Sequence, residues 1–221
     1  RTSEIFARVE PDAEPGEDPA RLQERFPKPD MAPVGSIAIT DFPHQNESEP
    51  GLLMLAWPPL REFTLDDALL LDLFVGNLAS GDASNLYKRF IDSQTRLLDL
   101  GSSGVFGWVS SDQGMPIYIG LDDTRREAAT EKMIDSVRSI VLAEIEAIAN
   151  YADGSEELRE FNARAASDVM SMRRQLRENL NSPPRFGFRN AGWWWDGHLH
   201  SLYRVDGFRK QLTLTDNLAL A

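Results

Sequence analysis

Two histidines lie close enough in the sequence to share a metal ion. They occur in Asp196-Gly-His198-Leu-His200, and residues two apart project from the same face of a strand. Zinc sites in proteins use three or four protein ligands, and no third ligand has a fixed spacing from this pair. Two exposed histidines in a loop beside a glycine are the simpler interpretation. The sequence therefore assigns no metal site, and His198 and His200 stay as weak candidates.

A second histidine stretch comes close to a zinc-peptidase motif. His44-Gln-Asn-Glu47-Ser48 matches H-x-x-E-H except at its last position, where Ser48 replaces the second histidine. Pro43 and Pro50 enclose the stretch, and proline disfavours the helix on which this motif places its ligands. With one histidine and no helix, the stretch does not encode a zinc site.

Nucleophilic and phosphate-binding chemistry has no support in the sequence. The chain has no cysteine, which excludes disulfides, thiolate metal sites and a cysteine nucleophile. No serine lies in a G-x-S-x-G pattern, and Gly101-Ser-Ser-Gly104 is too short for a phosphate-binding loop and lacks its lysine. Paired carboxylates such as Asp66-Asp67 lie at expected helix starts, where they complement the helix dipole. We therefore assign no catalytic residue.

Three consecutive tryptophans, Trp193, Trp194 and Trp195, are the most unusual feature of the sequence. Successive residues on a helix point about 100° apart, so three adjacent indoles cannot all enter one core. A core position with incidental exposure explains them as well as a contact with a partner does. At least one indole is expected to face solvent, another domain or a ligand. We take the three as candidates for a docking or ligand-binding surface.

The charge balance limits the partners of the chain. Its 35 acidic and 23 basic side chains give a formal net charge of −12, which disfavours binding to nucleic acid or to an anionic membrane. An apolar fraction of 42 % suffices for a sizeable core. No apolar run approaches the roughly 20 residues of a membrane span. We expect a cationic partner, no nucleic acid and no membrane; the sequence indicates no cellular compartment.

The N-terminal part differs from the rest of the chain. Ten of the 13 prolines lie within residues 1–59, and residues 10–35 are also acidic. We interpret residues 1–35 as an extended Pro-rich acidic linker or arm, with one helical turn at Ala20–Arg25, and residues 36–221 as a single domain. Because the chain starts with Arg1 instead of methionine, we expect a piece of a longer polypeptide.

The predicted domain begins with strands and two helices. Ser36–Thr40 suits a short edge strand, and Leu52–Trp57 is an apolar run typical of a buried strand. Thr64 is followed by two acidic residues, Asp66 and Asp67. This pattern predicts that Thr64 is the N-cap of a helix that ends near Ser80-Gly81. A second helix is expected over Ser84–Leu98.

A hairpin and a long helix follow. Val105–Val109 and Ile117–Leu121 have the composition of strands and are joined by a polar turn, which predicts an antiparallel hairpin. Thr124 and Glu127 have the spacing of a capping box, and we expect them to open a long amphipathic helix that ends before Asp153-Gly154.

Further helices are expected over Ser155–Asn179, Arg185–Trp195 and Leu202–Leu212. Strands and helices alternate irregularly along the chain, and the middle strands form a hairpin. This order indicates an α+β fold, in which helices pack on one face of an antiparallel sheet.

The order of these elements resembles a known family. Residues 77–92 join two helices by a small polar turn, the hairpin over 103–121 comes next, and a long helix pair follows. This arrangement resembles the pitrilysin/insulinase superfamily of zinc metallopeptidases, which repeat an α/β unit of the LuxS/MPP-like type. The similarity is to the second, non-catalytic unit of the presequence-protease-like branch. It covers roughly residues 33–215, and residues 186–197 resemble a later helical segment of that unit.

The resemblance implies a function for the parent protein and not for this chain alone. It implies a large zinc-dependent metalloendopeptidase that degrades peptides, with zinc held by H-x-x-E-H in its first unit. This chain lacks that motif and the Arg–Tyr pair of active members, so no catalytic residue is carried over, no cofactor is expected here, and the chain alone should be inactive.

The resemblance also implies the partners of the chain. They would be the remaining domains of the parent chain and peptide substrates, because the domain would wall the substrate chamber and support the zinc-bearing unit. The alternative is an inactive homologue that acts as a scaffold or binding subunit.

Overall fold

The computed structural model describes residues 33–43, 46, 48–58, 64–109, 116–181 and 213–218. By its contacts the chain divides into two units, Arg1–Ser36 and Ile37–Ala221, and the helices and strands given below belong to the second. Several predictions lie outside the described residues. These are the arm except for residues 33–35, and the helices expected over 185–195 and 202–212.

Three strands form one antiparallel sheet in the described part of the second unit. They are β1 (Gly51–Trp57), β2 (Gly104–Trp108) and β3 (Ile117–Thr124), in the order β1–β3–β2. β2 and β3 pair directly along the chain, which confirms the predicted hairpin. β3 pairs with both neighbours, and it runs three residues beyond its predicted end because β1 continues alongside it to Thr124.

The predicted strand over Ser36–Thr40 is wrong. These residues form no strand, and most of them are exposed. The N–H of Ser36 instead donates to the carbonyl oxygen of Pro33 at 3.0 Å, in a turn. An alternating apolar pattern makes a strand only where a neighbouring strand accepts its backbone hydrogen bonds.

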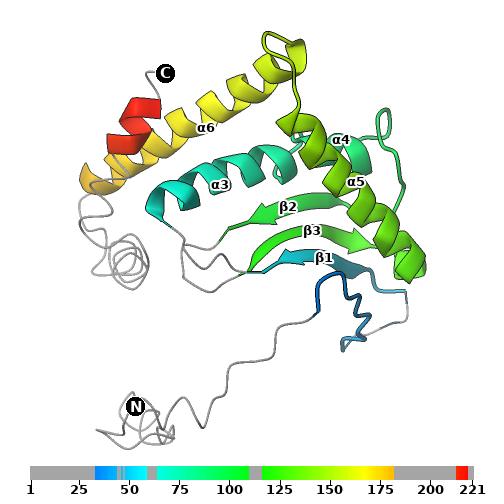
Figure 1. Ribbon diagram of the computed structural model, residues 1–221. Coiled ribbons are helices and arrows are strands. Elements are labelled where there is room, and N and C mark those ends of the chain that lie inside the picture. The colour runs from blue at the N-terminus through cyan, green and yellow to red at the C-terminus, as the bar shows by residue number, and fades with distance from the viewer. Residues whose placement is uncertain are drawn as a thin grey trace, which may run out of the picture. The chain divides into compact units, whose positions relative to one another are not determined.

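The helices lie on one side of the sheet (Figure 1). α3 (Leu65–Ala79) and α4 (Asn85–Phe90) contact β2, and α5 (Glu131–Ala149) crosses over the strands. α6 (Glu156–Asn181) packs on α3, and the short helix over residues 213–218 lies beside α6. The chain therefore has the α+β fold that the sequence predicted.

α3 begins where the sequence placed it. The side chain of Thr64 accepts a hydrogen bond from the N–H of Asp67 at 3.2 Å, and Asp67 accepts from the N–H of Thr64 at 3.1 Å. This reciprocal pair satisfies two backbone donors that the first helical turn leaves open. Thr64 is therefore confirmed as the N-cap.

α4 is much shorter than the helix predicted over Ser84–Leu98. It ends at Phe90, because Asp92 accepts hydrogen bonds from the N–H of Gln94 at 3.0 Å and from the hydroxyl of Thr95 at 2.9 Å. The carbonyl oxygen of Lys88, 2.7 Å from the same hydroxyl oxygen, shares its single proton with Asp92. Such local side-chain bonds compete with the helical pattern of the backbone and end the helix.

α5 starts later than the capping box at Thr124 predicted. Thr124 is the last residue of β3, and its hydroxyl donates to the carbonyl oxygen of Leu121 at 3.1 Å. A single 3₁₀ turn, Arg126–Ala128, follows. The observed N-cap of α5 is Thr130, whose hydroxyl accepts from the N–H of Met133 at 3.3 Å.

The hydrophobic core fills the space between the sheet and the helices. Side chains from one face of the sheet meet the inward faces of α3, α4 and α5. The fully buried members of this core with the largest side chains are Leu78, Leu86, Phe90, Leu100, Leu121, Val137 and Val141. Because residues alternate between the two faces of a strand, the opposite face of the sheet carries a separate set of side chains.

Candidate functional site

The residues singled out in the sequence lie outside the described part of the chain. This holds for His198 and His200, for the tryptophans Trp193, Trp194 and Trp195, and for His44 and Glu47. Within the described residues, no three side chains of His, Asp or Glu come together to hold a metal ion. None of the described helices is long and apolar enough to cross a membrane.

The sheet face turned away from the helices is apolar and partly open to solvent. We define the open sheet face as Leu52, Met54, Phe106, Trp108 and Tyr118, which the strand register brings to one side. Leu52 is 54 % exposed, Met54 45 % and Trp108 47 %. The predicted strand over Leu52–Trp57 is confirmed, but its predicted burial is wrong for this outward face. β1 lies at the edge of a sheet that the described helices cover on one face.

Aromatic side chains organise this face. The rings of Trp108 and Tyr118, on neighbouring strands, stack with centroids 5.7 Å apart and planes 10° from parallel. The ring of Phe106 lies over Gly120, where any added Cβ atom would overlap it. The glycine thus makes room for a ring in the middle of the face.

A buried polar network joins three helices on the covered side. Glu144 of α5 is 6 % exposed and accepts hydrogen bonds from Asn85 Nδ2 at 2.8 Å and from Arg89 Nε at 2.7 Å. Asn85 in turn bonds to the hydroxyl of Tyr151 at 3.0 Å and accepts from Arg164 Nη2 at 2.6 Å. The network links α4, α5 and α6, and its carboxylate has a cationic partner, as a buried charge requires.

Two carboxylates face the contact between α3 and α6. Asn77 donates to Asp168 at 2.8 Å and to the carbonyl oxygen of Leu73 at 2.9 Å. Partial burial raises the pKa of Asp72, and the nearby carboxylate of Asp168 raises this pKa further. Protonation of Asp72 is therefore easier in the folded chain than in the unfolded chain. Asp72 as a whole is nevertheless exposed to solvent.

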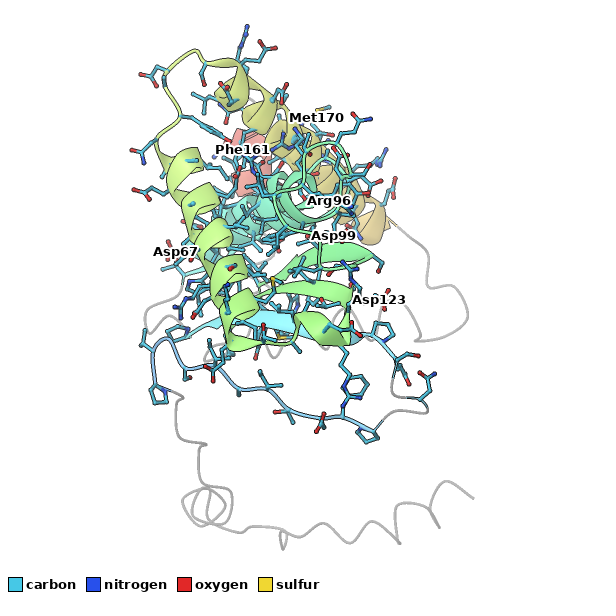
Figure 2. All side chains as sticks on the ribbon, turned by 90° about the vertical axis from the view of Figure 1, so that its right-hand side faces the viewer. Asp67, Arg96, Asp99, Asp123, Phe161 and Met170 are labelled. Atoms are coloured by element: carbon cyan, nitrogen blue, oxygen red, sulfur yellow. The ribbon has the colours of Figure 1, made fainter. Side chains whose placement is uncertain are left out.

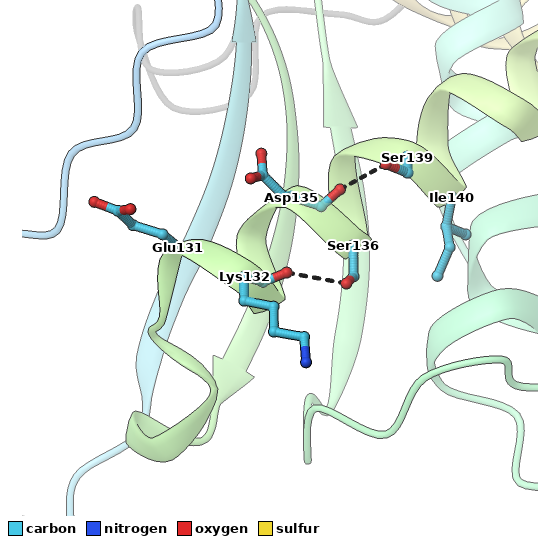
Figure 3. A pocket seen from close by; sticks show the side chains of 6 residues that line it. All are labelled: Glu131, Lys132, Asp135, Ser136, Ser139 and Ile140. Atoms are coloured by element: carbon cyan, nitrogen blue, oxygen red, sulfur yellow. Dashed lines mark hydrogen bonds between the residues drawn. The ribbon is translucent and has the colours of Figure 1, made fainter.

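Among the depressions on the described helical surface are one on α5 and one on α6. The larger, about 640 Å³, lies along the first turns of α5, between Glu131 and Ile140 (Figure 3). Its serines are engaged within the helix, because Ser136 donates to the carbonyl oxygen of Lys132 and Ser139 to that of Asp135. This depression therefore offers no activated hydroxyl.

The second depression, about 390 Å³, lies on α6 and contains Arg173, Arg174 and Arg177. The carboxylate of Asp216 holds Arg173 at 2.5 Å and Arg177 at 3.1 Å. These ion pairs hold the short helix over residues 213–218 on α6, so Arg173 and Arg177 have a structural role. Met170, labelled in Figure 2, lies on the same part of α6.

Within the described residues, these features amount to a partly exposed apolar sheet face and polar contacts between helices. Sequence reasoning missed the open sheet face and the Glu144 network. The available signal for the open sheet face was an uncharged stretch, Gly51–Trp57, in a chain with 26 % charged residues. A comparison with models of known protein families finds no match, and a comparison with curated proteins finds none either.

Proposed function

We propose that this chain is a non-catalytic domain of a large zinc-dependent metalloendopeptidase that degrades peptides. In this proposal the domain walls the substrate chamber and supports the unit that carries zinc. The observation that carries it is the order of elements. Two helices joined by a small polar turn, an antiparallel hairpin and a long helix pair follow one another as they do in the second unit of the similar peptidases.

The polar turn between α3 and α4 has a defined local geometry. α3 ends at Ala79, Gly81 has a φ of +77°, and Ser84 caps α4 through the N–H of Tyr87 at 3.3 Å. A positive φ suits glycine and reverses the chain between the two helices. The turn thereby supports the resemblance with local geometry and not with composition alone.

The arrangement of helices and sheet suits a domain that lines a substrate chamber. Helices cover one face of the sheet, and the Glu144 network fastens α4, α5 and α6 to one another. The open sheet face leaves an apolar surface for the remainder of the parent protein or for peptide substrates. Zinc would be bound in the first unit of the parent protein, where it would activate water for peptide hydrolysis.

The test uses the parent gene and its full-length product. We would sequence the gene upstream of the Arg1 codon over about one domain length. We would then measure the zinc content of the purified protein and its cleavage of a fluorogenic peptide. The expected result is an H-x-x-E-H motif with a distal Glu, about one zinc per chain, and peptide cleavage that is lost when residues 37–221 are deleted.

Absence of the motif together with absence of zinc would overturn the peptidase proposal. The inactive scaffold would then be the function to examine, and binding partners of the open sheet face would be sought first.

A further inference from the structure

Within the described residues, no helix covers the open sheet face, since α3, α4 and α5 pack on the other side (Figure 1). Leu52, Met54 and Trp108 are each about half exposed there. The carboxylate of Asp122 lies on the same face beside Gly104, and it has no hydrogen bond or ion pair within the described part of the chain. The face is therefore apolar and carries an unpaired negative charge.

One segment of the chain matches this face in composition. Residues 182–212, between α6 and the helix over residues 213–218, hold seven of the chain's 20 Phe, Trp and Tyr residues. The three tryptophans at 193–195 are among them. Aromatic side chains of this size gain free energy from contact with another apolar surface, and the stacked rings of Trp108 and Tyr118 offer one.

The charge of this segment matches as well. Residues 182–212 contain five basic and two acidic residues, whereas the described residues contain 12 basic and 22 acidic ones. Residues 1–32, the other long stretch outside the described part, are themselves acidic, with eight acidic and five basic residues. Opposite charges therefore favour residues 182–212 as the occupant. Repulsion disfavours residues 1–32, and it also disfavours a second copy of the chain, which carries −12.

The length of the segment suffices to reach the face. The helix over residues 213–218 returns to the end of α6 through the ion pairs of Asp216 with Arg173 and Arg177, so the segment starts and finishes at one place. In Figure 1, α6, β1 and β2 all end on the left side of the second unit. Residues 182–195 span up to about 45 Å when extended, and the eight residues of β3 span about 27 Å.

We propose that the aromatic segment Phe186–Trp195 of this chain packs on the open sheet face, with its tryptophans against Trp108 and Tyr118. The sheet is then covered on both faces, and the exposed side chain of Met54 is buried. Another polypeptide can occupy the face only by displacing this segment. The inference concerns one chain by itself and does not depend on the peptidase proposal.

Oxidation of methionine by dilute hydrogen peroxide, followed by mass spectrometry, tests the proposal on the 221-residue chain. Met54 lies on the face, and Met170, which is 65 % exposed on α6, is the internal reference. The comparison is a variant with Trp193→Ser, Trp194→Ser and Trp195→Ser, whose fold is checked by circular dichroism. If the segment covers the face about four fifths of the time, Met54 should be oxidised about fivefold faster in the variant. Met170 should be oxidised at the same rate in both chains.

A cross-linking measurement tests the contact directly. The chain has no cysteine, so two introduced thiols report one contact. Met54→Cys combined with Trp194→Cys should form a disulfide within the chain under mild oxidation. Met170→Cys combined with Trp194→Cys is the control. Residue 170 is closer to residue 194 in the sequence, so chance encounters alone would favour the control pair.

Three results would overturn the proposal. The first is equal oxidation of Met54 in the unsubstituted chain and in the tryptophan variant. The second is protection of Met54 that grows with the concentration of the chain, which would assign the face to a second copy. The third is a disulfide that forms as readily at residue 170 as at residue 54.

Discussion

Gly107 on β2 lies so close to Val75 on α3 that any Cβ atom at Gly107 would overlap Cγ1 of Val75. The same added atom would lie 3.2 Å from the Cβ of Ala79. The helix therefore packs directly on the backbone of the strand. This close approach lets Ser80, just after α3, accept the outward N–H of Gly107.

Gly107→Ala should destabilise the fold. Overpacking a tight contact costs about 1–3 kcal/mol, because α3 would have to move away from β2. Urea unfolding followed by circular dichroism measures the change. Gly76→Ala is the control: it lies in α3 with no atom within 4 Å of the added Cβ. Alanine there should stabilise the helix by about 0.5–1 kcal/mol. Equal effects at the two glycines would contradict the close packing.

Arg89 should contribute to stability through its buried partner. The Arg89 side chain is 38 % exposed and that of Glu144 7 %, with Nε and Oε2 2.7 Å apart. Arg89→Met leaves the carboxylate without its cation, and we expect a loss of about 1–3 kcal/mol. This is less than for a fully buried pair, since solvent reaches Arg89.

The neighbouring residue supplies the control for this substitution. Lys88 pairs with Glu160 at 3.8 Å, and both side chains are about half exposed. Lys88→Met should therefore change the free energy of unfolding by less than about 0.5 kcal/mol. In the double variant Arg89→Met/Glu144→Gln, part of the loss should be recovered because no buried charge remains. Additive losses would show that the two side chains act independently.

Asp72 should make the fold more stable as the pH falls. Its pKa is raised in the folded state, first by burial and then by Asp168, so the folded chain binds this proton more tightly than the unfolded chain. The gain appears as the pH falls through the folded pKa toward about 4. The Asp72→Asn variant should therefore be more stable than the unsubstituted chain at pH 7, and this difference in stability should shrink at pH 4.5.

Two other aspartates have the opposite pH dependence and must be separated from Asp72. The N–H of Gln94 lowers the pKa of Asp92, and the N–H of Gly101 lowers that of Asp99, so their stabilisation is lost in acid. Asp92 and Asp99 are present both in the unsubstituted chain and in the Asp72→Asn variant. Their contributions to the pH dependence therefore cancel when the two stabilities are compared. Asp82→Asn, at an exposed turn position, is the control. If the stability difference between the unsubstituted chain and Asp72→Asn does not change with pH, the raised pKa of Asp72 is refuted.

The sequence predicted elements whose signals are local. Thr64 caps α3 because the residues that form the cap are three apart in the chain. The hairpin of β2 and β3 follows from neighbouring apolar segments and a polar turn. β1 shows where local signals end: its apolar run predicted burial, yet its exposure depends on the order of strands in the sheet. Likewise, Glu144 meets Asn85 and Arg89 across more than fifty residues, which no local pattern encodes.

Two threonines, Thr124 and Thr130, compete as the N-cap of α5. Thr124 with Glu127 has the better sequence pattern, but pairing with β1 extends β3 and takes up Thr124, whose hydroxyl lies 3.0 Å from that of Ser102. Thr130 then caps the helix alone. Thr130→Ala should cost about 1 kcal/mol and speed amide exchange at Met133, whose N–H loses its acceptor. Ser139→Ala, within the same helix, should be neutral or slightly stabilising, because that hydroxyl only bonds back to the carbonyl of Asp135. Unchanged exchange at Met133 would contradict the assignment of Thr130 as the N-cap.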